Sequence, residues 1–466
     1  MSRQVEGDTS REREIQGISL QTLQKFHKAF YADPKNCLAQ NVATRQDPLE
    51  VCAVRRTQEE TSHVFTHKIE NEGKPITHQK NSGRCWIFAC LNVIRIPFMK
   101  QYNLEEFEFS QAHLFFWDKL ERINYLLHKI IDVARQGEQP SGRLLSFMLS
   151  DPVPDGGQWD MLVNLINKYG LMPKRNFPEA YSDEHTARMN SILRSKIREF
   201  TKVILDMVQS GNGDVPLETR VEEMLGDVYR ILGICLGIPS DSFTWEYYDK
   251  NKQYHSAGPI TTKAFYDEYV KPIYNVEDKI CLVTDPRPAN PYGKLYTIDC
   301  LGNLIGGRRT LYNNQSVELL MELAAKSIQH NEAVWFGCDV DKKFYSSKGF
   351  LDLSCLDYKL VFGVNVYNGL DKADRLLYSE SKMTHAMVFT AVTLDENGHP
   401  LKWRVENSWG DERGDKGYIV MKNDWFQEYV YEVVVDKQFV SPEVLAIMDQ
   451  EPVVLPAWDP MGALAY

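Results

Sequence analysis

The sequence predicts an α+β protein in which a helical lobe is followed by a lobe of antiparallel, barrel-like sheet. Apolar residues recur at helical spacing through the first half of the chain, whereas short β-rich runs separated by turn residues dominate after Pro272. The chain has 466 residues, of which 43% are hydrophobic and 25% charged, as in ordinary globular proteins. This composition excludes disorder for most of its length.

Each predicted element has a local cause. Pro97 is expected to end or kink the helix that starts at Cys85, and Ser110 is the expected cap of the next helix. A loop is expected over 151–158, DPVPDGGQ. Helices are predicted over 20–30, 85–94, 105–131, 184–208 and 217–236, and strands over 279–284, 294–298, 333–339, 385–393, 402–407 and 417–421.

Charge and cysteine usage exclude several classes of protein. The net charge of -11 opposes non-specific attraction to nucleic acid or anionic lipid. Nine scattered cysteines without a CxxC pair argue against a disulfide framework and a structural metal, so no cofactor is expected. The charged N-terminus has no apolar signal core, and no run approaches the ~18 apolar residues of a membrane span. A cytoplasmic protein without a membrane partner is expected.

Cys85 is the candidate nucleophile. Gly83 permits a sharp turn into the helix, whose free N–H groups favour a negative charge on sulfur. Gln79, six residues upstream, is placed to hold an oxyanion together with the Cys85 N–H. The alternative is that Cys85 is simply a small buried apolar residue, which is how we interpret Cys90 within the same helix.

His385 is the candidate base among eleven histidines. It begins one β-rich run, and Asn407 ends another 22 residues later. The Asn carboxamide is expected to accept the imidazole Nδ1–H and so turn Nε2 toward the sulfur, with Trp409 covering that bond from water. The histidines at 63, 67 and 78 have no such partner in the sequence.

These motifs resemble the papain superfamily, in which Gln, Cys, His and Asn occur in this chain order. The resemblance implies a papain-like two-lobe core and a substrate-binding glycine strip at Gly156 and Gly157, in the segment DGGQ. In papain and the cathepsins the base follows the nucleophile by ~130–150 residues. Here the interval is 300 residues, so large helical insertions are expected.

Longer strings resemble the bleomycin hydrolase family from about residue 35 to the C-terminus. They include NSGRCWIFACLNV, FSQAHLFFWDKLER, DGGQWDML, THAMVFTAV, WRVENSWG and LPAWDPMGALA. The family implies a cytosolic cysteine aminopeptidase that forms a homohexamer and cleaves the first amide bond of short peptides with a free N-terminus. Bleomycin is an expected substrate through the same amide cleavage, and related esters such as homocysteine thiolactone are chemically accessible to this acyl transfer.

The resemblance also gives the C-terminal tail a role. In this family the tail enters the cleft and its carboxylate pairs with the substrate's α-ammonium, which places Ala465 and Tyr466 among the substrate-binding residues. Tyr466 follows the family's ending as one extra residue, and we expect it to be trimmed.

The predicted parts are an N-terminal extension with the first helix (1–34), a helical lobe with inserted arms (35–245), a β-rich lobe with His and Asn (246–450) and the tail (451–466).

Two alternatives stay open at this stage. The first is a barrel that binds nucleic acid or peptides and has only secondary peptidase activity, for which Arg308, Arg309 and the basic helix 194–202 would supply the charge. The second is an endopeptidase whose tail stays outside the cleft.

Overall fold

The computed structural model describes residues 17–211, 216–366 and 369–463. The chain divides into two compact units. The smaller comprises Met1–Val54 and Leu356–Asn368, and the larger comprises Arg55–Cys355 and Gly369–Tyr466. Ala465 and Tyr466, both predicted to bind substrate, lie outside the described residues, as do residues 212–215 between the helices predicted over 184–208 and 217–236.

The smaller unit is a set of short helices. Ser19, Asp33 and Asp47 cap three of them by accepting a main-chain N–H, as expected of these residue types. An antiparallel bridge between Ala53 and Leu356 joins its two chain segments. Its helices are α1 (Leu20–Ala32), α2 (Pro34–Ala43), α3 (Pro48–Cys52) and α14 (Tyr358–Phe362).

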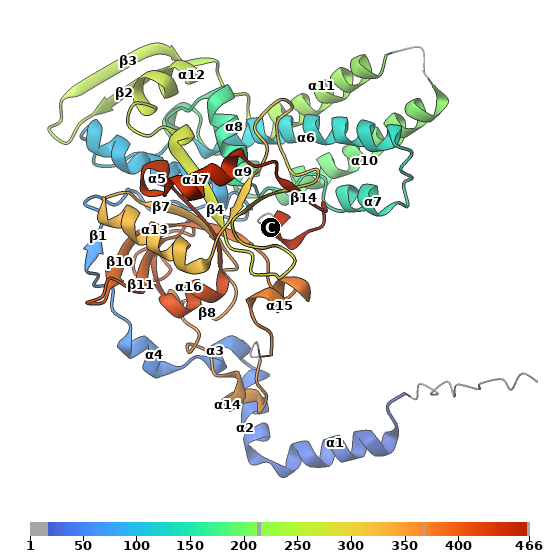
Figure 1. Cartoon of the computed structure of the whole chain (residues 1–466), viewed down its shortest axis with the longest axis vertical. Helices are drawn as coiled ribbons and strands as arrows, with labels where there is room; N and C mark the ends of the chain where they lie inside the picture. The colour runs from blue at the N-terminus through green and yellow to red at the C-terminus, as the bar shows by residue number, and fades with distance from the viewer. Residues whose placement is uncertain (1–16, 212–215, 367–368, 464–466) are drawn as a thin grey trace, which may run out of the picture. The chain divides into compact units, whose positions relative to one another are not determined.

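The helices of the larger unit precede most of its strands in the sequence. Figure 1 shows α6, α10 and α11 side by side, away from the sheet. The longer helices are α5 (Cys85–Gln101), α6 (Gln111–Arg135), α7 (Arg143–Ser150), α8 (Trp159–Tyr169), α10 (Ala187–Ser210), α11 (Leu217–Leu236) and α13 (Val317–Gln329). The shorter ones are α4 (Arg55–Glu60), α9 (Tyr181–Glu184), α12 (Thr262–Phe265), α15 (Lys372–Leu377), α16 (Asn423–Tyr429) and α17 (Pro442–Leu445).

Two local predictions for these helices have different outcomes. Ser110 caps α6 by accepting the N–H of His113, as predicted. Pro97 was expected to end or kink α5, and an end at this residue is wrong, because the helix continues for another four residues to Gln101. Proline removes one helical hydrogen bond, but this helix is buried along most of its length, and the packing of its flanking residues Ile96 and Phe98 holds it together.

Within the described residues, one twelve-stranded sheet forms the rest of the larger unit, in the order β14-β5-β6-β4-β13-β7-β10-β11-β12-β9-β8 with β1 also on β10. Most neighbours are antiparallel, as predicted, but β4 with β6, β9 with β12 and β5 with β14 are parallel. The strands are β1 (His67–Lys68), β4 (Lys279–Val283), β5 (Lys294–Ile298), β6 (Tyr312–Asn314), β7 (Val334–Cys338), β8 (Phe344–Tyr345), β9 (Phe350–Leu351), β10 (His385–Leu394), β11 (Pro400–Glu406), β12 (Tyr418–Lys422), β13 (Val430–Asp436) and β14 (Val453–Leu455). A separate hairpin pairs β2 (Ser242–Tyr248) with β3 (Tyr254–Thr261).

The helix α5 packs against the central strand β10, and this contact brings the two candidate catalytic segments together. Trp335 on the neighbouring strand β7 donates its indole N–H to the main-chain oxygen of Trp86, at 3.2 Å. Both tryptophans are buried, so this bond holds the first turn of α5 to the sheet in a water-free setting. The mixed helix and sheet architecture is the predicted fold class.

Candidate active site

Cys85 is the first residue of α5 and is 1% exposed. Its Sγ accepts the main-chain N–H of Ala386, at 3.4 Å, so the sulfur lies against the start of β10. Burial raises the pKa of the thiol to about 12, while the N–H groups of Ala386, Trp86 and Cys85 itself act in the opposite direction. The structure thus places the sulfur at a helix N-terminus, next to the residue that follows His385.

His385 begins β10, and its ring Nε2 lies 2.9 Å from Oδ1 of Asn407. The ring of Trp409 lies over the imidazole with centroids 4.8 Å apart. Burial lowers the pKa of His385 to about 4, and the Asn407 bond opposes that shift. The predicted trio of His385, Asn407 and Trp409 is therefore brought together.

The predicted choice of ring nitrogen is wrong. We expected Nδ1 to face Asn407, but Nε2 does so. The strand register gives the reason: Val388 of β10 pairs with Glu406 of β11, so Asn407 follows level with Met387, two residues from His385 along the strand. The Asn407 carboxamide therefore lies within reach of the ring and engages Nε2, so Nδ1 is the ring nitrogen that remains for a proton transfer.

The two shifts of pKa have a joint consequence for the chemistry. A lone thiolate and a lone imidazolium are each disfavoured by burial at this site. Transfer of the proton from Cys85 to His385 creates both charges at once, and each then stabilises the other. The Cys85 thiolate and the His385 imidazolium are therefore expected to form only together, as an ion pair.

Gln79 is 5% exposed and lies on the segment that enters α5. Its Oε1 accepts the hydroxyl of Ser408 at 2.6 Å, and its Nε2 donates to the main-chain oxygen of Ser82 at 2.5 Å. An amide nitrogen carries two hydrogens, so one N–H remains for a ligand. Sequence reasoning missed Ser408, although its place directly after Asn407 is the signal that would have identified it.

The predicted glycine strip is buried beside the nucleophile helix. A Cβ on Gly157 would stand 2.7 Å from the indole of Trp86, so only glycine fits at this position. Trp86 in turn donates its N–H to the main-chain oxygen of Asp155, at 2.8 Å. Gly156 and Gly157 are thereby held against the first turn of α5.

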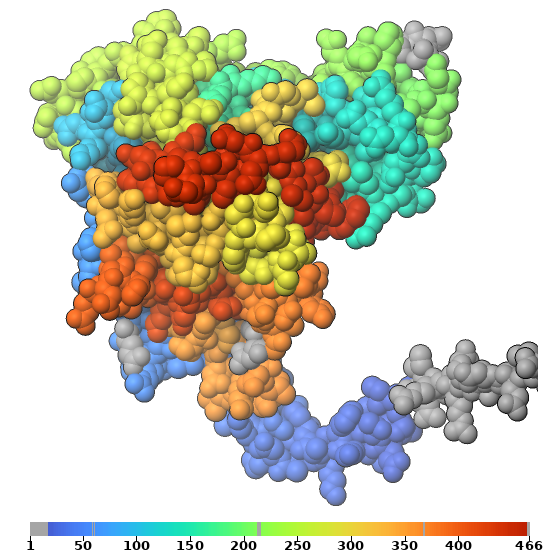
Figure 2. Space-filling model, viewed as in Figure 1, coloured from blue at the N-terminus to red at the C-terminus, as the bar shows by residue number. Residues whose placement is uncertain are grey.

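The C-terminal tail is anchored at several points before it reaches this strip. Its strand β14 adds to β5, Asp459 forms an ion pair with Arg287 at 2.8 Å, and Met461 is buried. Figure 2 shows this segment, in red, as a continuous band that ends beside helices α6 and α7. Gln158, next to the glycine strip, donates from Nε2 to the main-chain oxygen of Ala463 at 2.9 Å. The last described residue of the tail therefore contacts the side chain of the residue that follows Gly157 in the sequence.

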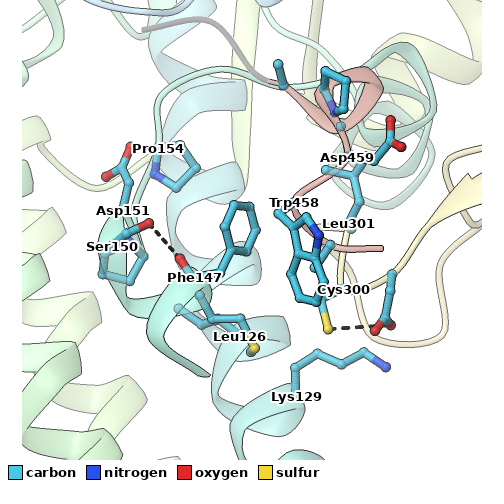
Figure 3. A pocket seen from close by; sticks show the side chains of 18 of the residues that line it. Leu126, Lys129, Phe147, Ser150, Asp151, Pro154, Cys300, Leu301, Trp458 and Asp459 are labelled. Carbon is cyan, nitrogen blue, oxygen red and sulfur yellow. Dashed lines mark hydrogen bonds between the residues drawn. The ribbon is translucent and has the colours of Figure 1, made fainter. Parts of the chain in front are cut away.

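A cavity of about 390 Å³ lies along the tail. Figure 3 shows the indole of Trp458 in it, beside Phe147 of α7 on one side and Leu301 on the other. The guanidinium of Arg143 lies 3.8 Å from the centre of the Trp458 ring. Ala463 is also part of the cavity wall, so this space is continuous with the place where the tail meets Gln158.

The basic residues that favoured a nucleic-acid barrel have local partners. Arg308 pairs with Asp160 and Glu277, Arg194 with Asp151, and Lys202 with Asp206. Their charge is thus largely compensated where it arises.

Among the described residues there is no group of His, Cys, Asp or Glu arranged to hold a metal ion. In the same part of the chain, no helix is both long and apolar enough to cross a bilayer.

Comparisons with known proteins show what this chain is similar to. A model of the Peptidase C1-like family matches residues 17–462. Bleomycin hydrolase of Gallus gallus is 56% identical over 451 residues, which are 96% of this chain and 99% of that protein. Aminopeptidase C of Streptococcus thermophilus is 38% identical over 448 residues, again 96% and 99% of the two chains. The crystal structure of PepW from Lactobacillus rhamnosis HN001 superposes with a TM-score of 0.91 at 36% identity, and covers 96% of this chain and 99% of that one.

Proposed function

Because the chain belongs to the Peptidase C1-like family, with bleomycin hydrolases among its relatives, we propose that it is a cysteine aminopeptidase. The family resemblance predicted from the sequence is confirmed by these matches. The proposed reaction removes the N-terminal residue of short peptides by cleaving the first amide bond. Bleomycin, through its amide bond, and homocysteine thiolactone, through its thioester, are proposed as further substrates, because a thiolate attacks the carbonyl carbon of both.

The proposed mechanism is acyl transfer through a thioester. Nδ1 of His385 takes the proton of the Cys85 thiol, and the sulfur attacks the carbonyl carbon of the first peptide bond. Asn407 keeps the ring in place through Nε2. As the tetrahedral intermediate collapses, the imidazolium gives its proton to the leaving amine. Water then attacks the thioester with His385 as base, which releases the amino acid and restores the thiol.

Two N–H groups are proposed to hold the oxyanion of the intermediate, one from the Gln79 side chain and one from the main chain of Cys85. Gly156 and Gly157 are proposed to bind the substrate's main chain, and Trp409 to shield the His385 ring and contact the leaving group. The supporting geometry is the fixed orientation of Gln79 and the packing of Gly157 on Trp86.

The hydrogen bond between Gln158 and Ala463 is the observation that carries the choice of aminopeptidase over endopeptidase. It supports a tail that occupies the cleft next to the glycine strip, where an endopeptidase would bind further residues of its substrate. Three residues follow Ala463, and the terminal carboxylate is proposed to pair with the substrate's α-ammonium. We propose that Tyr466 is trimmed so that Ala465 carries this carboxylate, and an intact mass that keeps Tyr466 after long incubation would contradict the trimming.

One fluorogenic peptide, prepared with a free and with an acetylated N-terminus, tests the proposal. The parent enzyme should cleave the free form and reject the acetylated form. Cys85→Ala should abolish turnover, whereas Cys90→Ala, a change at another buried thiol of α5, should retain it. Equal cleavage of both peptides would favour an endopeptidase, and activity in Cys85→Ala would end the cysteine-peptidase assignment.

We further propose that the protein is a homohexamer that works in the reducing cytoplasm. All nine cysteines are free thiols, which supports a reducing compartment. Within the smaller unit, α1 buries none of its residues and exposes Leu20, Leu23 and Phe26, which supports association with another copy. Sedimentation at several concentrations would measure the assembly, and a monomer throughout would contradict it.

A further inference from the structure

The carboxylate of Asp155 joins the turn that carries Cys85 to the glycine strip. Its Oδ2 accepts the main-chain N–H of Gly83 at 3.2 Å and the hydroxyl of Thr186 at 2.6 Å. Its Oδ1 accepts the amide of Asn190 at 2.7 Å and lies 2.7 Å from Nζ of Lys119. Asp155 is 9% exposed, and the next two residues along the chain are Gly156 and Gly157.

Lys119 completes this connection from helix α6. Its side chain is fully buried, and besides Asp155 its ammonium donates to the main-chain oxygens of Val153 at 3.1 Å and Pro154 at 2.9 Å. One cation therefore fixes three consecutive residues that lead into the strip. The ion pair holds the pKa of the Asp155 carboxyl well below its usual range, so the group is charged when it receives these donors.

We infer that Asp155 is a positioning residue of the peptidase reaction, because its carboxylate sets the distance between the Cys85 turn and the strip that holds the substrate. This inference rests on the proposed function. The proposed reaction needs the sulfur and the bound carbonyl carbon at near-bonding distance, and the two are carried by separate segments of chain. Asp155 bonds to the first segment through Gly83 and belongs to the second.

A carboxylate suits this position for a specific chemical reason. Four donors converge on two oxygens, and a carboxylate offers acceptor sites on both. Asparagine would present its own N–H groups to two of the four donors, and alanine would accept none. A loss of position is expected to appear in kcat, because an error of ~1 Å in placing the reacting groups costs about 10²-fold in rate.

A buried ion pair is also a structural element, so the test has to separate position from stability. Asp155→Ala leaves the Lys119 ammonium buried and without its carboxylate, whereas Lys119→Met/Asp155→Ala removes both charges. If Asp155 served stability alone, the double variant would regain both thermal stability and kcat. If it positions the turn, the double variant regains stability while kcat stays low.

The measurements are Tm, the concentration of reactive thiol by titration, and kcat and KM per titrated site on the free-amine peptide. We expect Asp155→Ala to lower kcat by about 10²-fold with KM unchanged, in line with the cost of misplacing the reacting groups. The double variant should keep that low kcat at a recovered Tm. Asp436→Ala is the control, because it removes the carboxylate 2.8 Å from another buried lysine, Lys279, and should lower Tm without changing kcat. Lys279 keeps a second partner in Glu332 at 2.6 Å, so the fall in Tm should be smaller than in Asp155→Ala.

Should Asp155→Ala fail to fold, Thr186→Val provides the milder test, since it removes one donor to Oδ2 and keeps the charge pair. A fall in kcat at an unchanged Tm supports the inference. A parental kcat in folded Asp155→Ala, in the double variant or in Thr186→Val overturns it. Cys85→Ala measured in parallel separates the proposed function from the positioning role of Asp155. If Cys85→Ala is inactive while the Asp155 variants are fully active, only the positioning role fails.

Discussion

Gln79 and Ser408 are joined by two hydrogen bonds. The Ser408 hydroxyl donates to Oε1 of Gln79 at 2.6 Å, and the main-chain N–H of Gln79 donates to the Ser408 oxygen at 2.8 Å. Ser408 follows Asn407, which accepts a hydrogen bond from the His385 ring, so the proposed oxyanion donor and the proposed base are both bonded to the same short segment. The bond to Oε1 also fixes which end of the Gln79 carboxamide presents its N–H groups.

The first prediction concerns this orientation. Gln79→Ala should lower kcat by about 10² to 10³-fold, the usual cost of removing one oxyanion donor. Ser408→Ala should lower kcat by about tenfold, because a lost hydrogen bond of ~1.4 kcal/mol corresponds to that factor and the carboxamide is then free to turn. Steady-state kinetics on the free-amine peptide measures both. A Ser408→Ala enzyme with parental kcat would show that Gln79 does not need this bond.

The second prediction concerns the reactivity of the thiol. Burial is the largest cause that raises the pKa of Cys85 to about 12, so alkylation near neutral pH is expected to depend on His385 as proton acceptor. His385→Ala should slow the reaction with iodoacetamide at pH 7 by about 10²-fold, since only the thiolate reacts. The rate in this variant should still be rising at pH 10. Asn407→Ala should give an intermediate rate, and a His385→Ala rate equal to the parent's would contradict the proton transfer.

The third prediction concerns the tail. Asp459→Asn keeps an acceptor for the main-chain N–H of Met461 but removes the charge that Arg287 binds. Loss of a charge-assisted pair of ~1.5 kcal/mol should loosen the tail and raise cleavage of the acetylated peptide about tenfold. Glu451→Gln is the control, because this tail carboxylate is 90% exposed and its contact with Arg309 is long, at 3.8 Å. Unchanged rejection of the acetylated peptide by Asp459→Asn would show that this ion pair does not hold the tail in place.

The fourth prediction concerns stability and pH. Burial raises the pKa of Glu432 to about 8 from its ordinary 4.5, while the Cys281 thiol donates to its Oε1 at 2.8 Å. The folded protein therefore keeps a proton that the unfolded chain releases above pH 4.5. The resulting stabilisation is full below pH 4.5 and is lost as the pH rises through 8, at up to ~1.4 kcal/mol per pH unit.

Glu432→Gln should remove this slope, since glutamine keeps an acceptor for Cys281 and does not titrate. Urea unfolding of the parent and the variant at intervals between pH 5 and pH 9 measures the difference. Glu443→Gln, which changes an exposed carboxyl, should leave the slope as it is. If the free energy of unfolding changes with pH in the same way in the parent and in Glu432→Gln, Glu432 is not protonated in the folded protein.

The sequence by itself determined the local elements and the identity of the candidate site residues. A glycine followed two residues later by a cysteine and an apolar run predicts a thiol at a helix N-terminus, and the structure starts α5 at Cys85. The short β-rich runs located the strand that begins at His385 and the strand that ends near Asn407, within one or two residues. The strand Val430–Asp436 was missed, because it follows α16 directly and no turn residue separates the two.

Only the tertiary structure decided how these pieces meet. The meeting of the His385 ring with Asn407 depends on the register of β10 against β11, and the partner of Gln79 lies more than three hundred residues away. The four donors on Asp155 come from three parts of the chain, and the tail reaches Gln158 only because β5 and Arg287 hold it. A residue's own neighbours in sequence fix its backbone conformation and its polarity. Its hydrogen-bond partners depend on which distant segments the core packs beside it. The sequence read without its fold does not show which segments these are.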